Sequence, residues 1–135
     1  MTAALLAAAA VLSGCAAATK DSAGDFTGER KAVAQTIEDL QKAGSDGDEA
    51  KICDDLLAAP VVARLKAAPG AKNDCATALG DSLDDADSFE MTVKSVTVNG
   101  TTATAVVKSE AGKKDRTDTL DLVKEGSNWK LMSIG

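Results

Sequence analysis

Thiols and carboxylates are the side chains of this 135-residue sequence best suited to do chemistry, since it has 3 Cys and 21 Asp or Glu but no His and no Tyr. The absence of His excludes an imidazole general base, the commonest group for proton transfer. Only Phe26, Phe89 and Trp129 are aromatic, which leaves no platform for stacking nucleobases. Each remaining thiol and carboxylate has to be weighed against a structural role.

The first cysteine, Cys15, follows an Ala-, Leu- and Val-rich run from Leu5 to Leu12. The run is too short to span a bilayer but is typical of the hydrophobic region of a signal peptide. Together with this run, Leu12-Ser13-Gly14-Cys15 resembles the lipobox of bacterial lipoproteins, in which the Cys thiol is diacylated before cleavage. The chain departs from that pattern because residues 1–5 contain no Lys or Arg. The alternative is a buried N-terminal helix that ends at a free thiol.

This resemblance implies a signal peptide over residues 1–14, a lipidated Cys15 and attachment to the extracytoplasmic face of the cell membrane. Palmitate-type acyl chains contribute about 0.8 kcal/mol per buried CH₂, so two or three of them anchor a protein stably. Residues 16–27 are small and polar without periodicity, which is typical of a flexible tether. We expect one folded domain over residues 28–135.

The other two cysteines, Cys53 and Cys75, each fall on the apolar face of a predicted helix. An even remainder of cysteines in an exported chain favours a disulfide. Such a bridge would stabilise a small, alanine-rich domain by about 3 kcal/mol in the chain-entropy model. The alternative is a redox pair, but Cys-x-x-Cys spacing and a cationic cluster to activate a thiolate are missing.

Two groups of carboxylates raise the question of a metal or acid–base site. Residues 45–49 alternate Asp with Gly as calcium loops do, but the remaining EF-hand ligands are absent. We interpret Asp46 as a helix cap with Glu49 as its capping-box partner. Glu90, Asp118 and Asp121 fall on predicted strands, and we expect all three to point outward. The sequence therefore predicts no metal site, no cofactor and no catalytic residue.

The net charge is −6, with a calculated pI near 4.6. Nothing in such a chain neutralises phosphates as a basic patch would, which argues against nucleic acid as a partner. It also argues against electrostatic docking on an anionic membrane surface.

Apolar residues at helical spacing predict four helices in the first two thirds of the chain. The expected segments are residues 28–43, 48–58, a short helix from Pro60, and 74–86. The first carries Val33, Ile37 and Leu40 on one face, with Gly44 as its stop signal. The third turns Val61, Val62 and Leu65 inward, and Asn73 caps the fourth.

The last third reads as four strands in a meander, because β-branched and apolar residues alternate between turn signals. The expected strands are residues 89–98, 101–108, 116–124 and 128–134. Asn99-Gly100 predicts a type I′ hairpin turn. The apolar parity changes between Val93 and Val96, which predicts a β-bulge at Lys94-Ser95. Residues 113–116 are expected to form a charged loop.

Helices followed by a bulged meander ending in Trp129 and Ile134 make this α+β chain similar to the cystatin-like cone of the nuclear transport factor two-like superfamily. The resemblance covers residues 28–135 and includes small bacterial lipoproteins of unknown function. Its carriers are core positions: Val33, Ile37, Leu40, residues 48–53, Val96, Val98, Ala103, Ala105, Leu120, Leu122, Trp129 and Ile134. Many such cones hold a small molecule, and the enzymes among them pair Asp with His or Tyr, which this chain lacks.

We therefore expect a lipid-anchored, non-catalytic binding module whose partner is an envelope protein or a small molecule. One alternative is a cone enzyme that uses buried carboxylates alone, which would need a pocket lined by Glu90, Asp118 or Asp121. The other alternative is a purely structural envelope lipoprotein.

Overall fold

The computed structural model describes residues 22–83, 90–111 and 114–134 of the chain, and the side chains of residues 82, 83 and 111 are not described. The helical part comprises the 3₁₀ turn η1 (Ala23–Asp25), α1 (Gly28–Asp46), α2 (Glu49–Lys51), the π-helical turn η2 (Ile52–Leu56), α3 (Ala59–Lys66) and α4 (Cys75–Leu83). The strands are β1 (Glu90–Asn99), β2 (Thr102–Ala111), β3 (Lys114–Glu125) and β4 (Asn128–Ile134). No helix within these ranges is long and apolar enough to cross a bilayer.

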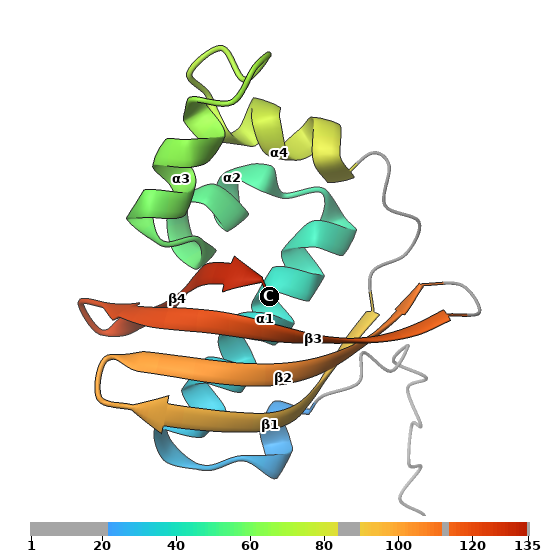
Figure 1. Ribbon diagram of the computed structural model, residues 1–135, viewed down its shortest axis with the longest axis vertical. Coiled ribbons are helices and arrows are strands. Elements are labelled where there is room, and N and C mark those ends of the chain that lie inside the picture. The colour runs from blue at the N-terminus through green and yellow to red at the C-terminus, as the bar shows by residue number, and fades with distance from the viewer. Residues whose placement is uncertain (1–21, 84–89, 112–113, 135) are drawn as a thin grey trace, which may run out of the picture.

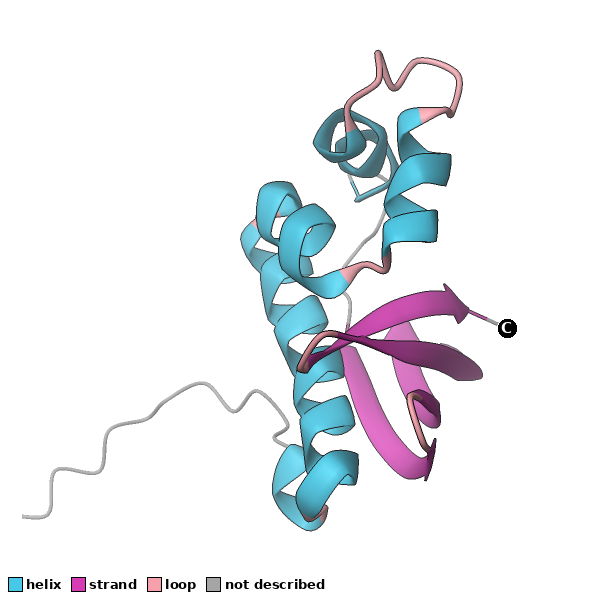
Figure 2. Cartoon of the chain, turned by 90° about the vertical axis from the view of Figure 1, so that its left-hand side faces the viewer, coloured by secondary structure: helices cyan, strands magenta, loops and turns pink. Residues whose placement is uncertain are grey.

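The four strands form one antiparallel sheet in the order β1-β2-β3-β4. The long helix α1 lies across one face of this sheet, while α2, α3 and α4 are stacked beyond its β4 edge (Figures 1 and 2). This arrangement confirms the predicted α+β fold of helices on a four-stranded meander. The core lies between α1 and the sheet, and its most fully buried large side chains include Ile37, Leu120 and Leu122.

The first hairpin turns one residue later than predicted. Asn99 pairs with Thr102, so the two central residues are Gly100 and Thr101. Gly100 has a φ of +64°, while Asn99 and Thr101 keep negative φ. A positive φ at the first central residue alone is the pattern of a type II′ turn, so the predicted type I′ turn is wrong.

Two β-bulges curve the sheet, and the first confirms the prediction from parity. The register between β1 and β2 shifts between Val93 and Ser95, which leaves Lys94 as the extra residue. The register between β3 and β4 shifts between Asp121 and Leu122, where Met132 is the extra residue. An extra residue returns the chain to the same face after three positions, so Leu131 and Ile134 lie on the same side of β4.

The predicted charged loop at residues 113–116 is wrong for the part that the structure describes. Lys114, Asp115 and Arg116 belong to β3, which begins two residues earlier than expected. They pair with the last residues of β2, and Lys108 forms an ion pair with Asp115 across the two strands. Cross-strand charge pairs of this kind extend the hairpin with polar residues.

The first helix passes through Gly44 and ends three residues after the predicted stop. Its C-cap is Gly47, whose φ of +68° is the left-handed conformation that glycine adopts without a Cβ penalty. Asp46 is consequently inside the helix and pairs with Lys42 one turn earlier. The predicted cap of the next helix is therefore wrong: Asp48 performs that role by accepting from the backbone N–H of Lys51.

The predicted second helix is shorter than expected, because α2 gives way to the π-helical turn η2 and then to extended backbone at Leu57. Leu57 bridges to Leu131, and the N–H of Ala58 donates to the Leu131 carbonyl over 2.9 Å. This contact ties the helical part to the free edge of β4. The next helix begins at Ala59 with Pro60 in its first turn, as predicted.

The fourth helix begins at Cys75, and its cap is Asp74 rather than Asn73. The Asp74 carboxylate accepts from the backbone N–H of Thr77, while Asn73 has a φ of +61°. Residues 84–86, the predicted end of this helix, lie outside the described residues.

The predicted tether is wrong for its last residues, because the folded domain already includes Ser22. The Ser22 hydroxyl accepts from the buried backbone N–H of Val93, and the Ala23 N–H donates to Glu38 of α1 over 2.7 Å. Both residues are buried. The hydrogen bond to Ser22 stabilises the fold, because a buried backbone N–H without a partner costs about 1–3 kcal/mol. Cys15 and the rest of the predicted tether lie outside the described residues.

Candidate functional site

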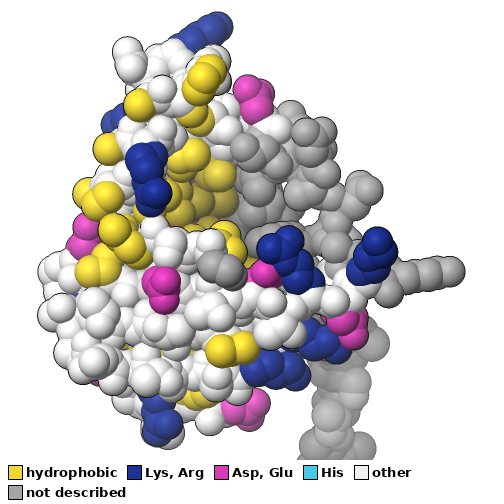
Figure 3. Space-filling view, in the orientation of Figure 1, with side chains coloured by type: hydrophobic (Ala, Val, Ile, Leu, Met, Phe, Trp, Pro, Cys, Tyr) yellow, Lys and Arg dark blue, Asp and Glu magenta, His cyan; other side chains and the backbone are white. Residues whose placement is uncertain are grey.

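An apolar cavity of about 460 Å³ opens between α1, η2, α3, α4 and the end of β4. Its volume is within the range of about 300–1,000 Å³ that is usual for small-molecule sites. Its lining residues are Leu40, Gly44, Ile52, Leu57, Val61, Arg64, Leu65, Leu79, Leu131, Met132, Ser133 and Ile134. Hydrophobic side chains are visible in this hollow between the upper helices and the sheet (Figure 3).

The geometry of α3 and β4 places these side chains together. On α3, Val61, Arg64 and Leu65 are spaced i, i+3 and i+4 and therefore share one face. On β4, the bulge at Met132 brings Ile134 to the side that holds Leu131, yet Ile134 remains 60% exposed. Of the predicted inward residues of the third helix, Val61 and Leu65 thus line the hollow, and both are only half-buried, as is Val62.

The predicted disulfide joins two of the elements that line this cavity. Cys53 of η2 and Cys75 of α4 are bonded, with their Cα atoms 6.1 Å apart. Both are buried in the core. Because η2 and α4 both line the cavity, through Ile52 and Leu79, the bridge holds two of its walls together.

Arg64 is the one charged residue that lines the cavity within the described part of the chain. Its guanidinium donates to the Met132 carbonyl over a long 3.4 Å, and no ion pair engages it among the described residues. The other polar side chain of the lining, Ser133, donates to Asp121 on the outer face of the sheet over 2.9 Å. The cavity therefore offers aliphatic walls and one cation.

The three strand carboxylates do not share a site. Glu90 and Asp121 are exposed, as expected, and Asp121 accepts from Thr104 on the outer face. Asp118 was expected to point outward as well, and this is wrong. It has the parity of Leu120 and Leu122 and pairs with buried Val107, so it lies on the helix-facing side.

The Asp118 carboxylate nevertheless already has hydrogen-bond partners on neighbouring residues. Its side chain is 14% exposed, and its carboxylate receives Arg116 at 2.6 Å and the Ser109 hydroxyl at 3.3 Å. Neither Asp118 nor any other described carboxylate lines the apolar cavity. The described lining therefore presents no carboxylate to a molecule bound there.

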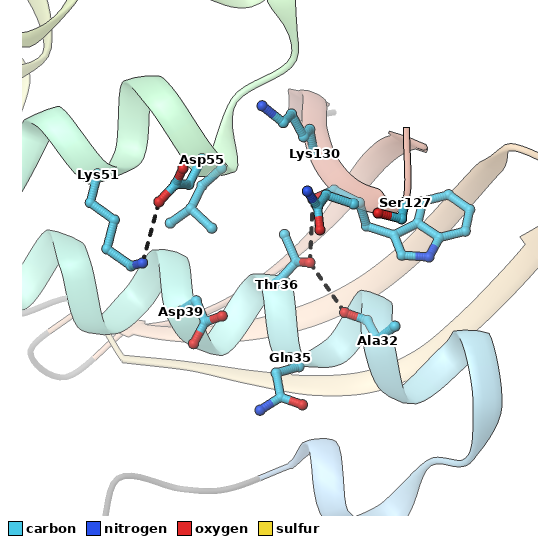
Figure 4. Close-up of a pocket in the computed structure, with 11 residues that line it drawn as sticks. Ala32, Gln35, Thr36, Asp39, Lys51, Asp55, Ser127 and Lys130 are labelled. Carbon is cyan, nitrogen blue, oxygen red and sulfur yellow. Dashed lines mark hydrogen bonds and ion pairs between the residues drawn. The ribbon is translucent and has the colours of Figure 1, made fainter. Parts of the chain in front are cut away.

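A second hollow, of about 390 Å³, lies on the side of α1 that faces the β3–β4 turn. Its wall is polar, with Gln35, Thr36 and Asp39 from α1 and Lys51 and Asp55 from the segment that follows (Figure 4). Lys51 forms an ion pair with Asp55, and the nearby Lys130 donates to the Asp54 carbonyl over 3.0 Å. Both ammonium groups thus already have partners within the protein. We therefore interpret this hollow as a polar groove open to solvent.

Beside this groove, the single tryptophan of the chain joins the sheet to α1. The Trp129 indole N–H donates to Glu29 over 2.6 Å, and Lys124 pairs with the same carboxylate at 2.8 Å. The Lys124 ammonium also lies 5.8 Å from the centre of the indole ring. The hydrogen bond from Lys124, and then that from Trp129, lowers the pKa of Glu29 below its ordinary value of 4.5.

This cluster predicts an acid-dependent contribution to stability. Because the folded pKa of Glu29 is the lower one, the contribution is complete above the unfolded pKa and is lost as the pH falls through the folded pKa. We expect Glu29→Gln to lower the free energy of unfolding at pH 7 and to match the wild type at pH values well below 4.5. Urea unfolding followed by Trp129 fluorescence measures this difference, with exposed Glu90→Gln as the control. A deficit of Glu29→Gln that is the same at every pH would contradict the assignment.

The helices on a curved antiparallel meander define a protein of the cystatin-like cone class, as the sequence resemblance implied. Residues 71–134, which comprise α4 and the whole sheet, match the model of a family described as "Putative lumazine-binding". No curated protein and no solved structure matches the chain. The matched segment supports a ligand-binding module of the cone type.

The cavity was not predicted from the sequence, and Arg64 was not identified as a candidate site residue. Val61 and Leu65 were expected to be ordinary core residues. The signal that could have identified Arg64 is its place between Val61 and Leu65 on one helix face, where a helix with a buried face would carry an apolar residue.

Proposed function

We propose that this protein is a non-catalytic module that binds an apolar small molecule in the cavity beside α3 and β4. The observation that carries the proposal is the cavity itself, with aliphatic walls and an exposed Ile134 at its edge. Large hydrophobic residues lining an open hollow are costly unless a ligand or partner covers them. Burial of a ligand there would gain about 0.8 kcal/mol per CH₂ group.

The non-catalytic role is supported by the chemistry of the lining. Proton transfer needs a general acid or base within hydrogen-bond reach of the substrate. The chain has no His, and the described walls of the cavity hold no carboxylate. Asp118, the one strand acid on the inner side, is already paired with Arg116.

The family description names lumazine, a flat and polar heterobicycle. The described lining gives such a ring no aromatic side chain for stacking and few polar groups for its edge, so an aliphatic ligand suits these walls better. Lumazine is therefore included as a competitor in the test below.

The proposal is tested with the full chain carrying Cys15→Ser and the neutral fluorophore prodan. We expect a blue-shifted emission and a dissociation constant on the order of 10–100 μM, corresponding to roughly 0.3–0.4 kcal/mol per non-hydrogen atom. 1-Decanol should displace the probe and lumazine should not. Displacement by lumazine alone would favour the heterobicycle, and absence of any saturable binding would reject a ligand-binding cavity.

We also propose that Cys15 carries acyl chains that hold the domain on the extracytoplasmic face of the membrane. The lipobox-like sequence supports this location. The described chain begins at Ser22 beside η1, which lies at the end of α1 away from α3 and α4 (Figure 1). The cavity would then face away from the anchored end, at about the 28 Å length of a 19-residue helix.

Replacement of the proposed lipidation site tests the anchor. We expect Cys15→Ser to move the protein out of the membrane fraction or to leave it unprocessed, because the acyl chains supply the membrane affinity. Fractionation of cells followed by intact-mass measurement checks both results. Ala17→Ser is the matched control, because it introduces the same serine two residues away, keeps Cys15 and should leave the membrane association intact. Unchanged fractionation and processing of Cys15→Ser would contradict the anchor.

A further inference from the structure

We propose that the ligand of the apolar cavity is a single-chain amphiphile with an anionic head group, and that Arg64 recognises this head group. The inference rests on the proposed function, since it assigns a chemical class to the ligand of that same cavity. The shared chemistry is an aliphatic chain that ends in a carboxylate or a phosphate monoester.

The shape of the lining separates an apolar part from a charged part. Aliphatic side chains from five elements form the walls, and they would hold the chain without requiring hydrogen bonds. The only described cation of the lining is on the last turn of α3, at the side of the cavity next to β4. A ligand that places methylenes against the walls can thus bring its head to the guanidinium.

The state of Arg64 supports the same assignment. A guanidinium has five N–H donors, and the described contacts of Arg64 use one of them in a long bond to Met132. By contrast, Arg116 and four lysines (42, 51, 108 and 124) of the described chain are engaged with carboxylates. Arg64 is one of several described cations without a described acidic partner, and it is the one among them that lines the apolar hollow.

Arginine suits an anionic head group for a geometric reason. Its planar fork matches the two oxygens of a carboxylate or a phosphate and can donate to both at once. A cationic head group would be repelled by Arg64, and a neutral one would forgo the charge-assisted bonds. The cavity should therefore rank ligands of equal chain length by head-group charge.

Calorimetric titration of the full chain carrying Cys15→Ser tests this ranking, because the substitution keeps the proposed acyl chains of the anchor out of the assay. The ligands are decanoate, decyl phosphate, 1-decanol and decyltrimethylammonium, each below its micellar concentration. We expect both anions to bind about tenfold more tightly than 1-decanol, with decyltrimethylammonium weakest. A difference between decanoate and decyl phosphate distinguishes a carboxylate ligand from a phosphate ligand. Hexanoate should bind more weakly than decanoate, by about fourfold per missing CH₂.

Two arginine variants and one control assign the effect to Arg64. Arg64→Gln should reduce the affinity for both anions to that for 1-decanol, while Arg64→Lys should keep part of the preference. Lys66→Gln removes an equal charge from the same helix turn outside the cavity and should behave as the wild type.

The outcomes separate the two proposals. Binding of 1-decanol and the anions with equal affinity, or a preference for anions that survives Arg64→Gln, would overturn the head-group assignment and leave the proposed function standing. Absence of binding by every ligand would overturn both.

Discussion

Reduction of the Cys53–Cys75 disulfide is expected to lower the free energy of unfolding by about 3 kcal/mol, the largest effect that a single covalent change should have on this domain. The two residues are 22 positions apart, and the bridge removes the loop-closure entropy of that segment from the unfolded chain. For a domain of this size, the loss corresponds to a melting temperature lower by roughly 10 °C or more.

Reduction should also weaken ligand binding, because the bridge joins η2 to α4 and these two elements carry Ile52 and Leu79 of the cavity. Without it, η2 and α4 lose the covalent link between them. We therefore expect loss of stability and loss of probe affinity together.

Thermal unfolding with and without dithiothreitol measures the effect, in the full chain carrying Cys15→Ser so that the cysteine pair is the only target. A Cys53→Ala, Cys75→Ala double variant should match the reduced protein and should not respond to the reductant. An unchanged melting temperature on verified reduction would contradict a stabilising bridge.

Leu65→Trp is expected to weaken binding of prodan or 1-decanol by roughly fiftyfold. Leu65 lies on the cavity face of α3 and is half-buried, so an indole at this position fills the hollow. Exclusion of about three methylene-sized groups, at about 0.8 kcal/mol each, gives this factor.

Ala63→Trp is the matched control for this variant. Ala63 is exposed on the same helix and does not line the cavity, so it receives the same added indole without filling the hollow. We expect it to bind as the wild type, and near-UV circular dichroism should show that both variants are folded. Equal affinity of the two variants would place the ligand elsewhere.

Much of the fold could be predicted because its signals are local. The alternation of β3 and β4, the parity change at Val93 and Val96 and the even pair of cysteines each define a structural feature without distant contacts. The same parity rule applies to Leu131 and Ile134, where the bulge at Met132 was detectable but was not predicted.

The errors arose where tertiary contacts decide between similar local choices. Ser22 has no sequence pattern of a domain boundary, yet it satisfies the N–H of Val93, 71 residues away. Gly44 is a valid stop signal, but Gly47 follows it and is used instead, so α1 gains another three residues. Leu57 leaves the helical conformation because it bridges to Leu131 at the edge of the sheet.

The candidate site was less predictable than the fold, because a cavity is a property of packing between elements. Val61, Leu65 and Leu79 have the spacing of core residues, and spacing alone does not show that helices α3 and α4 stand off from β4. The inward position of Asp118 could have been recognised from its parity with Leu120, which the outward assignment overlooked.

Methyl-resolved NMR during titration of the full chain carrying Cys15→Ser with 1-decanol shows where on the domain an apolar ligand binds. We expect saturable shifts concentrated at Leu40, Val61, Leu65, Leu79 and Ile134, with the buried methyls of Val107 and Leu120 unmoved. Shifts centred on the polar groove beside Thr36 and Lys51, or no shifts up to the solubility limit of the alcohol, would contradict a ligand site in the apolar cavity.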